Sequence, residues 1–215
     1  MSYTSQQWKV LAIVVKPCAA LSFIGSASIL SEILCRGGSK NKKLSMIYHR
    51  IMLGLSSMDV CSSFAFFLST WMIPRGTPGV WGAAGTTGTC TAQGFFTQFS
   101  FGSGMYNCAL AVYYLLVIRH GWTEDHFRNR KWVQLLMLAG PAFYVLLTGF
   151  IGLALDLFNS AMLWCYYANY PAGCSSSGCA DENSADTCIP CTRGRSRTRY
   201  TAGCVITFLC GRRCL

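Results

Sequence analysis

The chain has 215 residues and is 52% hydrophobic and 13% aromatic, but only 12% of its residues are charged. About 25% of the residues of soluble domains are charged, so this composition excludes an ordinary soluble domain, a disordered chain and a water-soluble nucleic-acid binder. The formal charge of +10 comes from 18 basic against 8 acidic residues. Six arginines lie in the last 23 residues, and the remaining basic excess is small enough to reflect membrane topology alone.

Four apolar stretches are long enough to cross a bilayer, because a hydrocarbon core about 30 Å thick needs roughly 20 helical residues. The first stretch runs from about residue 10 to 34 and contains Lys16 and Pro17. Either the span begins near Pro17, or Lys16 lies near the interface and extends its ammonium group to water. A cleavable signal peptide is the alternative, but the apolar run is too long and no small-x-small cleavage site ends it.

The other three stretches are 51–73, 95–118 and 132–155. Residues 51–73 contain a single acid, Asp59, and are followed by prolines and glycines that stop a helix. The last two stretches contain no Lys, Arg, Asp or Glu at all, which a helix with a solvated face could not sustain. The sequence therefore predicts an all-α integral membrane protein with four transmembrane helices.

The basic residues indicate the orientation of these spans. They are concentrated in the loops 36–50 and 119–131, whereas the loop between the second and third spans has only Arg75. Short basic loops stay in the cytoplasm. We therefore expect a multi-pass protein of the plasma membrane in which residues 1–9, the loop 74–94 and the Cys-rich region 159–215 lie outside.

The thirteen cysteines fall into groups. Four of them lie in or beside the spans, where a thiol behaves as a small apolar residue: Cys18, Cys35, Cys61 and Cys108. Six lie in segments assigned to the outside and are expected to form disulfides, with 15 possible connectivities: Cys90, Cys165, Cys174, Cys179, Cys188 and Cys191. A zinc site at Cys188 and Cys191 is the alternative, but neither a second CxxC nor a nearby His supplies further ligands.

Five short segments share their order and residue pattern with one receptor group: 21–26 (LSFIGS), 48–59 (YHRIMLGLSSMD), 90–96 (CTAQGFF), 106–118 (YN, then YYLLVI) and 163–165 (LWC). On these segments the chain resembles the seven-transmembrane G-protein-coupled receptors of the cyclic-AMP-receptor-like and secretin-like group. The four spans would correspond to the first four helices of such a receptor.

This resemblance implies a disulfide between Cys90, at the start of the third helix, and Cys165, in the loop after the fourth. It also implies an unknown extracellular ligand, a heterotrimeric G protein as partner, and Arg119 as part of the surface facing that transducer. Only 50 residues follow Cys165, and their one apolar run, 201–211, is too short to cross a bilayer. We therefore expect a truncated receptor that lacks helices five to seven.

Two polar residues are expected inside the membrane. Asp59 should face the bundle, where Ser56, Ser62 and Ser63 lie three or four residues away and could bond to it. Asp59 would serve either as an ion- or proton-sensitive switch or as a structural group that joins helices. Asn107 belongs to a row of small and polar residues that we expect to face the protein: Ser100, Ser103, Asn107, Ala111 and Tyr114.

The sequence carries no sign of catalysis. The three histidines have no acid-base partner or metal-ligand spacing around them, and neither a phosphate-binding loop nor a nucleophile elbow is present. We expect no enzymatic activity, no cofactor, no metal and no nucleic-acid partner, and we expect membrane lipid to contact the basic loop at Lys40, Lys42 and Lys43. The predicted function is receptor-like signalling, and the alternative is a structural or adaptor four-helix membrane protein with a disulfide-rich outer loop.

Overall fold

The computed structural model describes residues 4–35 and 46–169, and its long elements are helices. The first is α1 (Ser5–Cys35), and the second is α3 (Ile47–Leu68), continued by the 3-10 turn η1 (Ser69–Met72). The third consists of α4 (Thr87–Thr97) and α5 (Phe99–His120), and the last is α7 (Lys131–Ala154). Each of the four is long and apolar enough to cross a membrane. The prediction of an all-α membrane bundle is therefore confirmed.

Short elements join the long helices at both ends of the bundle. The helix α6 (Glu124–Asn129) lies between α5 and α7. After α7 the strands β1 (Phe158–Ser160) and β2 (Cys165–Tyr167) form an antiparallel hairpin in which Phe158 pairs with Tyr167. We call the end that holds this hairpin the disulfide end, and the end that holds α6 the basic end.

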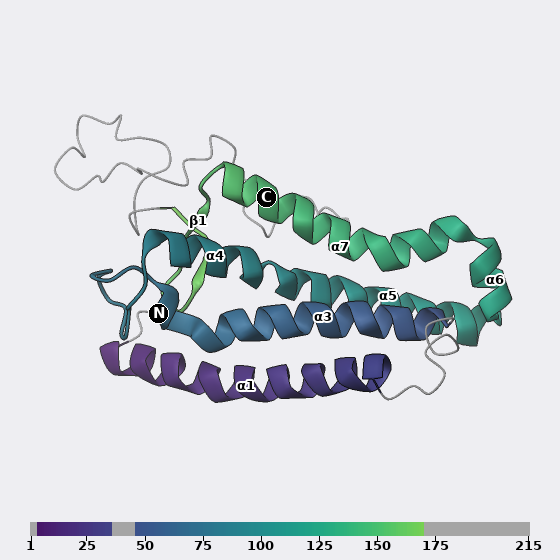
Figure 1. Ribbon diagram of the computed structural model, residues 1–215, viewed down its shortest axis with the longest axis horizontal. Helices are drawn as coiled ribbons and strands as arrows, with labels where there is room; N and C mark the ends of the chain where they lie inside the picture. Colours follow the sequence, from purple (N-terminus) through teal and green to yellow (C-terminus); the bar gives the residue numbers. More distant parts are fainter. Residues whose placement is uncertain (1–3, 36–45, 170–215) are drawn as a thin grey trace.

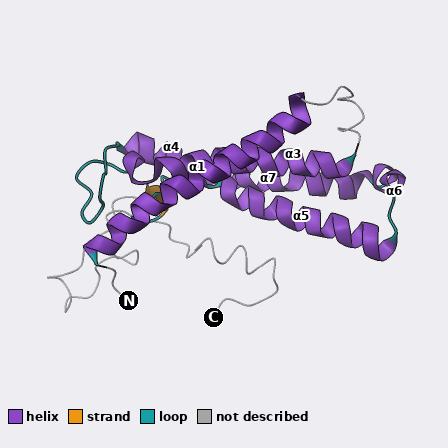
Figure 2. Ribbon diagram, turned by 90° about the horizontal axis from the view of Figure 1, so that it is seen from below, coloured by secondary structure: helices purple, strands orange, loops and turns teal. Residues whose placement is uncertain are grey.

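The four long helices lie side by side in the order α1, α3, α5, α7 (Figure 1). In the perpendicular view α1 runs obliquely across the others (Figure 2). The helix α4 packs against α3, α7 and both strands, so the hairpin is seated on the start of the third long helix. This arrangement places the connections of α3 and α7 around α4 at the disulfide end.

The first helix packs on α3 through small residues. Four buried positions of α1 follow one another at intervals of seven residues: Ala12, Ala19, Ser26 and Ile33. Seven residues are close to two helical turns, so these positions form one seam along the helix. Small side chains let two membrane helices approach closely.

The central contact between α3 and α5 depends on a glycine. A Cβ atom at Gly54 would lie 2.6 Å from the Tyr106 ring, closer than carbon atoms can approach. Tyr106 is buried and its hydroxyl donates to the carbonyl oxygen of Leu138 at 2.7 Å. Gly54 therefore makes room for a side chain that links α3, α5 and α7. The surrounding core contains Ile47, Ile51, Met58, Tyr106, Phe127 and Met137.

Two helices extend beyond the predicted spans. The first helix begins at Ser5 and continues through Pro17, so of the two alternatives for its start the one at Pro17 does not apply. The third begins at Thr87 rather than 95, because Thr86 and Thr89 form a capping box in which each side chain accepts from the other's backbone N–H. The span was predicted from the apolar run alone, and polar threonines fall outside such a run even where they start a helix.

Candidate functional site

A disulfide ties the third long helix to the segment that follows the fourth. Cys90 in α4 and Cys165 at the start of β2 are bonded across 75 residues of chain, with 5.3 Å between their Cα atoms. Both cysteines are buried against Ile73, Val80 and Ala83. This is the pair that the receptor resemblance implies. The bond holds the hairpin on α4.

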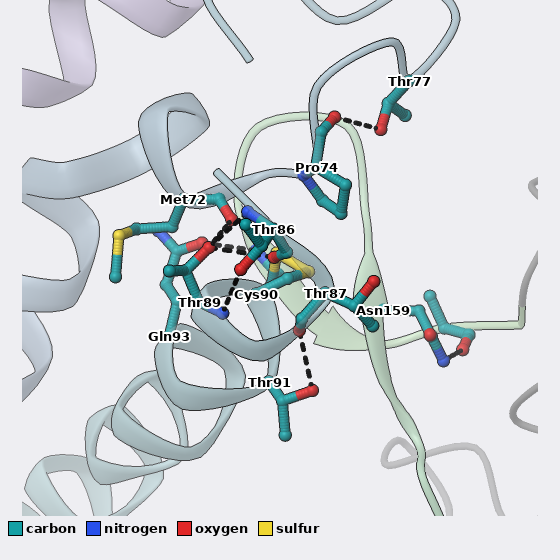
Figure 3. Close-up of a disulfide and its surroundings, with 12 residues drawn as sticks. Met72, Pro74, Thr77, Thr86, Thr87, Thr89, Cys90, Thr91, Gln93 and Asn159 are labelled. Carbon is teal, nitrogen blue, oxygen red and sulfur yellow. Dashed lines mark hydrogen bonds between the residues drawn. A yellow bond between two sulfur atoms is a disulfide. The ribbon is translucent and has the colours of Figure 1, made fainter. Parts of the chain in front are cut away.

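A buried glutamine next to the disulfide completes this connection. Gln93 lies beside Cys90 in α4 (Figure 3) and is only 1% exposed. Its Nε2 donates to the carbonyl oxygens of Ala65 at 2.9 Å and Ser69 at 2.8 Å. Its Oε1 accepts from the backbone N–H of Cys165 at 3.0 Å. The Ala65 carbonyl also accepts from the Ser69 backbone N–H at the C-terminal end of α3. Gln93 therefore adds a second bond at this end of α3 and fixes β2 at the same time.

A second glutamine links α7 to the hairpin. Gln98, at the junction of α4 and α5, donates from Nε2 to the Thr148 hydroxyl and to the Tyr167 hydroxyl, both at 3.1 Å. Its Oε1 accepts from the Tyr166 hydroxyl at 2.7 Å, and the Tyr167 hydroxyl donates to the carbonyl oxygen of Thr148 at 2.7 Å. This network joins three segments of the chain without a charged group.

Burial keeps the two tyrosines of this network protonated. It raises the pKa of Tyr167 to about 12, with a further contribution from Tyr144. Burial also raises the pKa of Tyr166 above its ordinary value, and Tyr167 and Tyr144 add to this shift. Both hydroxyls therefore remain donors over the physiological pH range.

The loop between η1 and α4 is held by hydrogen bonds. The backbone N–H of Gly85 donates to Ile73 at 2.8 Å, and that of Arg75 donates to Gly85 at 3.1 Å. The Thr89 hydroxyl donates to the carbonyl oxygen of Met72 at 2.9 Å. A Cβ atom at Gly85 would collide with that same carbonyl oxygen. The disulfide end is therefore a single hydrogen-bonded unit.

Lys16 binds an aromatic ring at the disulfide end. Its Nζ lies 3.3 Å from the centre of the Trp71 ring, which belongs to η1. Trp71 is at the end of the second membrane span, so Lys16 lies at the same depth, near the edge of the predicted bilayer. The second of the two sequence interpretations fits this geometry, with a cation–π contact added.

Asp59 does not meet the serines that were expected to surround it. The Ser63 hydroxyl donates to Ser22 in α1 at 3.0 Å, and the Ser62 hydroxyl donates to the main-chain carbonyl of Asp59 at 3.3 Å. The Ser56 hydroxyl is buried without a partner. Within residues 4–35 and 46–169, the Asp59 carboxylate makes no hydrogen bond or ion pair.

The row of small and polar residues on α5 faces the protein in part only. Ser103 is buried, but Asn107, Ala111 and Tyr114 are exposed. The expectation for these three positions was wrong because Tyr106 sets the orientation of the helix. Neighbouring residues lie about 100° apart around a helix, so burying Tyr106 against Gly54 turns Asn107 away from the core.

At the basic end, a hydrogen bond accepted by Glu124 connects α6 to the start of α3. The Glu124 carboxylate accepts from the backbone N–H of Ile47 at 3.2 Å and from the Tyr113 hydroxyl at 3.3 Å. Phe127 is fully buried between the rings of Tyr113 and Trp122. The predicted transducer residue Arg119 is exposed in the last turn of α5, close in sequence to this contact.

The part of the chain that the structure describes holds no group of three or more His, Cys, Asp or Glu side chains suited to a metal ion. Cys174, Cys179, Cys188 and Cys191 lie outside the described residues, so their predicted disulfides stay predictions.

These features define an α-helical membrane bundle whose disulfide end is closed by a covalent bond and two buried glutamines. No protein-family model, curated protein or solved structure matches the chain.

Proposed function

We propose that the chain is a membrane signalling protein of the G-protein-coupled receptor type. The observation that carries this proposal is the Cys90–Cys165 disulfide. It joins the start of the third long helix to the loop after the fourth, as in the receptors that the chain resembles. The buried contacts of Gln93 with α3 and β2 support the same role for this end.

In this proposal the chain lies in the plasma membrane with the amino terminus and the disulfide end outside. The basic end would face the cytoplasm, in keeping with its positive charges: Arg119, Arg128, Arg130 and Lys131. A ligand of unknown identity would approach the disulfide end, and a heterotrimeric G protein would bind near Arg119. Lipid surrounds the exposed apolar side chains, among them Leu21, Leu136 and Phe143.

The two ends of the bundle differ in how firmly they are joined. The disulfide end has a covalent bond, whereas α6 is attached to α3 through the hydrogen bonds of Glu124 and the packing of Phe127. A displacement of α5 relative to α3 therefore costs less at the basic end. This difference suits a switch that binds ligand at a rigid end and moves at the other.

The test uses membranes that contain the full chain and purified heterotrimeric G protein in its GDP-bound form. We expect the G protein to cosediment with these membranes and to exchange GDP for a GTP analogue faster than with membranes lacking the chain. Arg119→Ala should weaken both effects, whereas the matched control Arg75→Ala, at the other end, should leave them unchanged. Cosedimentation equal to that of empty membranes would contradict the proposal.

A second candidate is a structural or adaptor protein that organises partners in the plane of the membrane. The exposed Asn107 favours it, because an amide facing lipid gains hydrogen bonds when another helix covers it. A protein of this class would associate with partners in the absence of nucleotide exchange. Asn107→Leu would then weaken lateral association and leave the cosedimentation and nucleotide exchange of the G protein unchanged.

A further inference from the structure

Polar groups of α3 and α5 gather on one side of the helix pair. Asp59 and Tyr48 are eleven residues apart on α3, which places them within about 20° of each other around the helix. Asn107 and Tyr114 are seven residues apart on α5, with the same small angle between them. The rings of Tyr48 and Tyr114 lie 6.2 Å apart. Asp59 and Asn107 therefore face the same side.

Ser103 lies one turn from Asn107 but is buried. We call Asp59 and Asn107 the polar face. The Ser103 hydroxyl is buried without a hydrogen-bond partner. Across the described ranges 4–35 and 46–169, neither the Asp59 carboxylate nor the Asn107 amide makes a side-chain hydrogen bond. All three groups are thus left with unused bonding capacity.

The polar face lies near the middle of the membrane, where polar groups without bonding partners are energetically unfavourable. Asp59 is the thirteenth residue of a membrane span of 26 residues, Ile47–Met72, and so lies near its middle. A charged residue at the centre of a membrane helix is strongly disfavoured. Such residues normally pair with another ionisable residue or with backbone carbonyls.

We propose that the polar face binds the transmembrane helix of a partner protein that carries one lysine or arginine at mid-depth. The cation pairs with Asp59, while the Asn107 carbonyl supplies a further acceptor for its N–H groups. Gly104 lies beside this face with open space around its Cβ position, so the partner's backbone can come close.

Charge complementarity selects this occupant over the other possibilities. A second copy of the chain bound through the same face would bring Asp59 against Asp59, and like charges repel. The cationic head groups of lipids stay at the membrane surface, about 15 Å from the midplane of a core about 30 Å thick. A basic residue on a helix reaches the required depth. The pairing depends on the fold alone and is compatible with either function proposed above.

The test measures energy transfer between the full chain and synthetic helices in phosphatidylcholine vesicles. The chain carries a donor at its amino terminus, and the acceptor-labelled peptides are leucine-rich spans with a central lysine, leucine or glutamate. We expect the lysine peptide to bind about three- to tenfold more tightly than the leucine peptide, the range of polar contacts between membrane helices. The glutamate peptide should bind no better than the leucine peptide.

Two variants test whether Asp59 causes the preference for the lysine peptide. Asp59→Asn keeps the volume of the side chain and should bring the lysine-to-leucine ratio close to one. Ser57→Ala is the matched control, because Ser57 lies about 200° away around α3 and bonds to the Leu53 carbonyl of its own helix. This variant should keep the preference. Formation of the Cys90–Cys165 bond, identified by mass spectrometry of proteolytic peptides, verifies that each variant is folded.

Three results would overturn the proposal. The first is an absence of preference for the lysine peptide in the unaltered chain, a measurement that needs no variant. The second is a preference that survives in folded Asp59→Asn. The third is self-association of the chain that depends on Asp59 and is as tight as binding of the lysine peptide, which would assign the face to a second copy.

Discussion

Replacing Gln93 by methionine should destabilise the bundle more than any single change on its surface. Methionine has nearly the same length and volume, so the substitution removes polar contacts and leaves the packing close to native. Gln93 makes three hydrogen bonds to main-chain groups of α3, η1 and β2. The change therefore isolates the polar connection between these segments.

The magnitude follows from the number and burial of these bonds. A hydrogen bond contributes about 0.5 to 1.5 kcal/mol net, and the average between membrane helices is about 0.6 kcal/mol. Three bonds therefore contribute about 1.5 to 4.5 kcal/mol. The upper part of the range applies if the Cys165 N–H stays unpaired, since Cys165 is fully buried and its disulfide prevents the backbone from moving to water.

The assay is reversible unfolding of the purified chain by increasing SDS in mixed micelles, followed by circular dichroism. Thr91→Ala is the control on the same helix, because the Thr91 hydroxyl bonds only to Thr87 within α4. We expect the control to change the unfolding free energy by less than about 0.5 kcal/mol. The reasoning is refuted if Gln93→Met, with its disulfide formed, unfolds at the same SDS fraction as the unaltered chain.

Three further outcomes follow from the same structure. Gly54→Ala should destabilise the chain by about 1 to 3 kcal/mol because its Cβ would press on Tyr106, whereas Gly25→Ala, with open space around it, should be neutral in the same unfolding assay. Trp71→Leu removes the cation–π contact with α1 and should cost about 1 kcal/mol, measured in the same way. The pKa of Tyr167 is raised from 10.0 to about 12 in the folded state, so its contribution to stability is complete below pH 10 and is lost as pH rises to about 12. Tyr167→Phe should reduce that loss when melting temperature is measured against pH, and an unchanged profile would contradict the assignment.

The four spans could be predicted because a bilayer imposes strict limits on length and charge. The helices near residues 95–118 and 132–155 were evident from the absence of charged residues alone. The start of the third helix was missed because the polar threonines around Thr87 cap a helix that extends beyond the apolar run. Apolarity detects the part of a helix that meets lipid, and hydrogen bonds decide where the helix ends.

The disulfide end was less accessible to sequence analysis. The partners of Gln93 and Gln98 include main-chain oxygens and hydroxyls 24 to 69 residues away, and no residue pattern specifies such contacts. The signals available in the sequence were Gln98, inside the predicted span 95–118, and Gln93, just before it. For Asn107 the polar row was visible in the sequence, but its orientation was not. The spacing correctly indicated a polar row, but the packing of Tyr106 against Gly54 decided which way that row faces.

The central claim is that the chain crosses the membrane between its disulfide end and its basic end. The direct measurement places a short epitope after Gly79 in one variant and after Asn129 in another, and tests antibody binding to intact and permeabilised cells. We predict that the epitope at Gly79 is stained on intact cells and that the epitope at Asn129 is stained only after permeabilisation. Staining of both epitopes on intact cells, or of neither, would place the two ends on one side of the membrane and contradict the account.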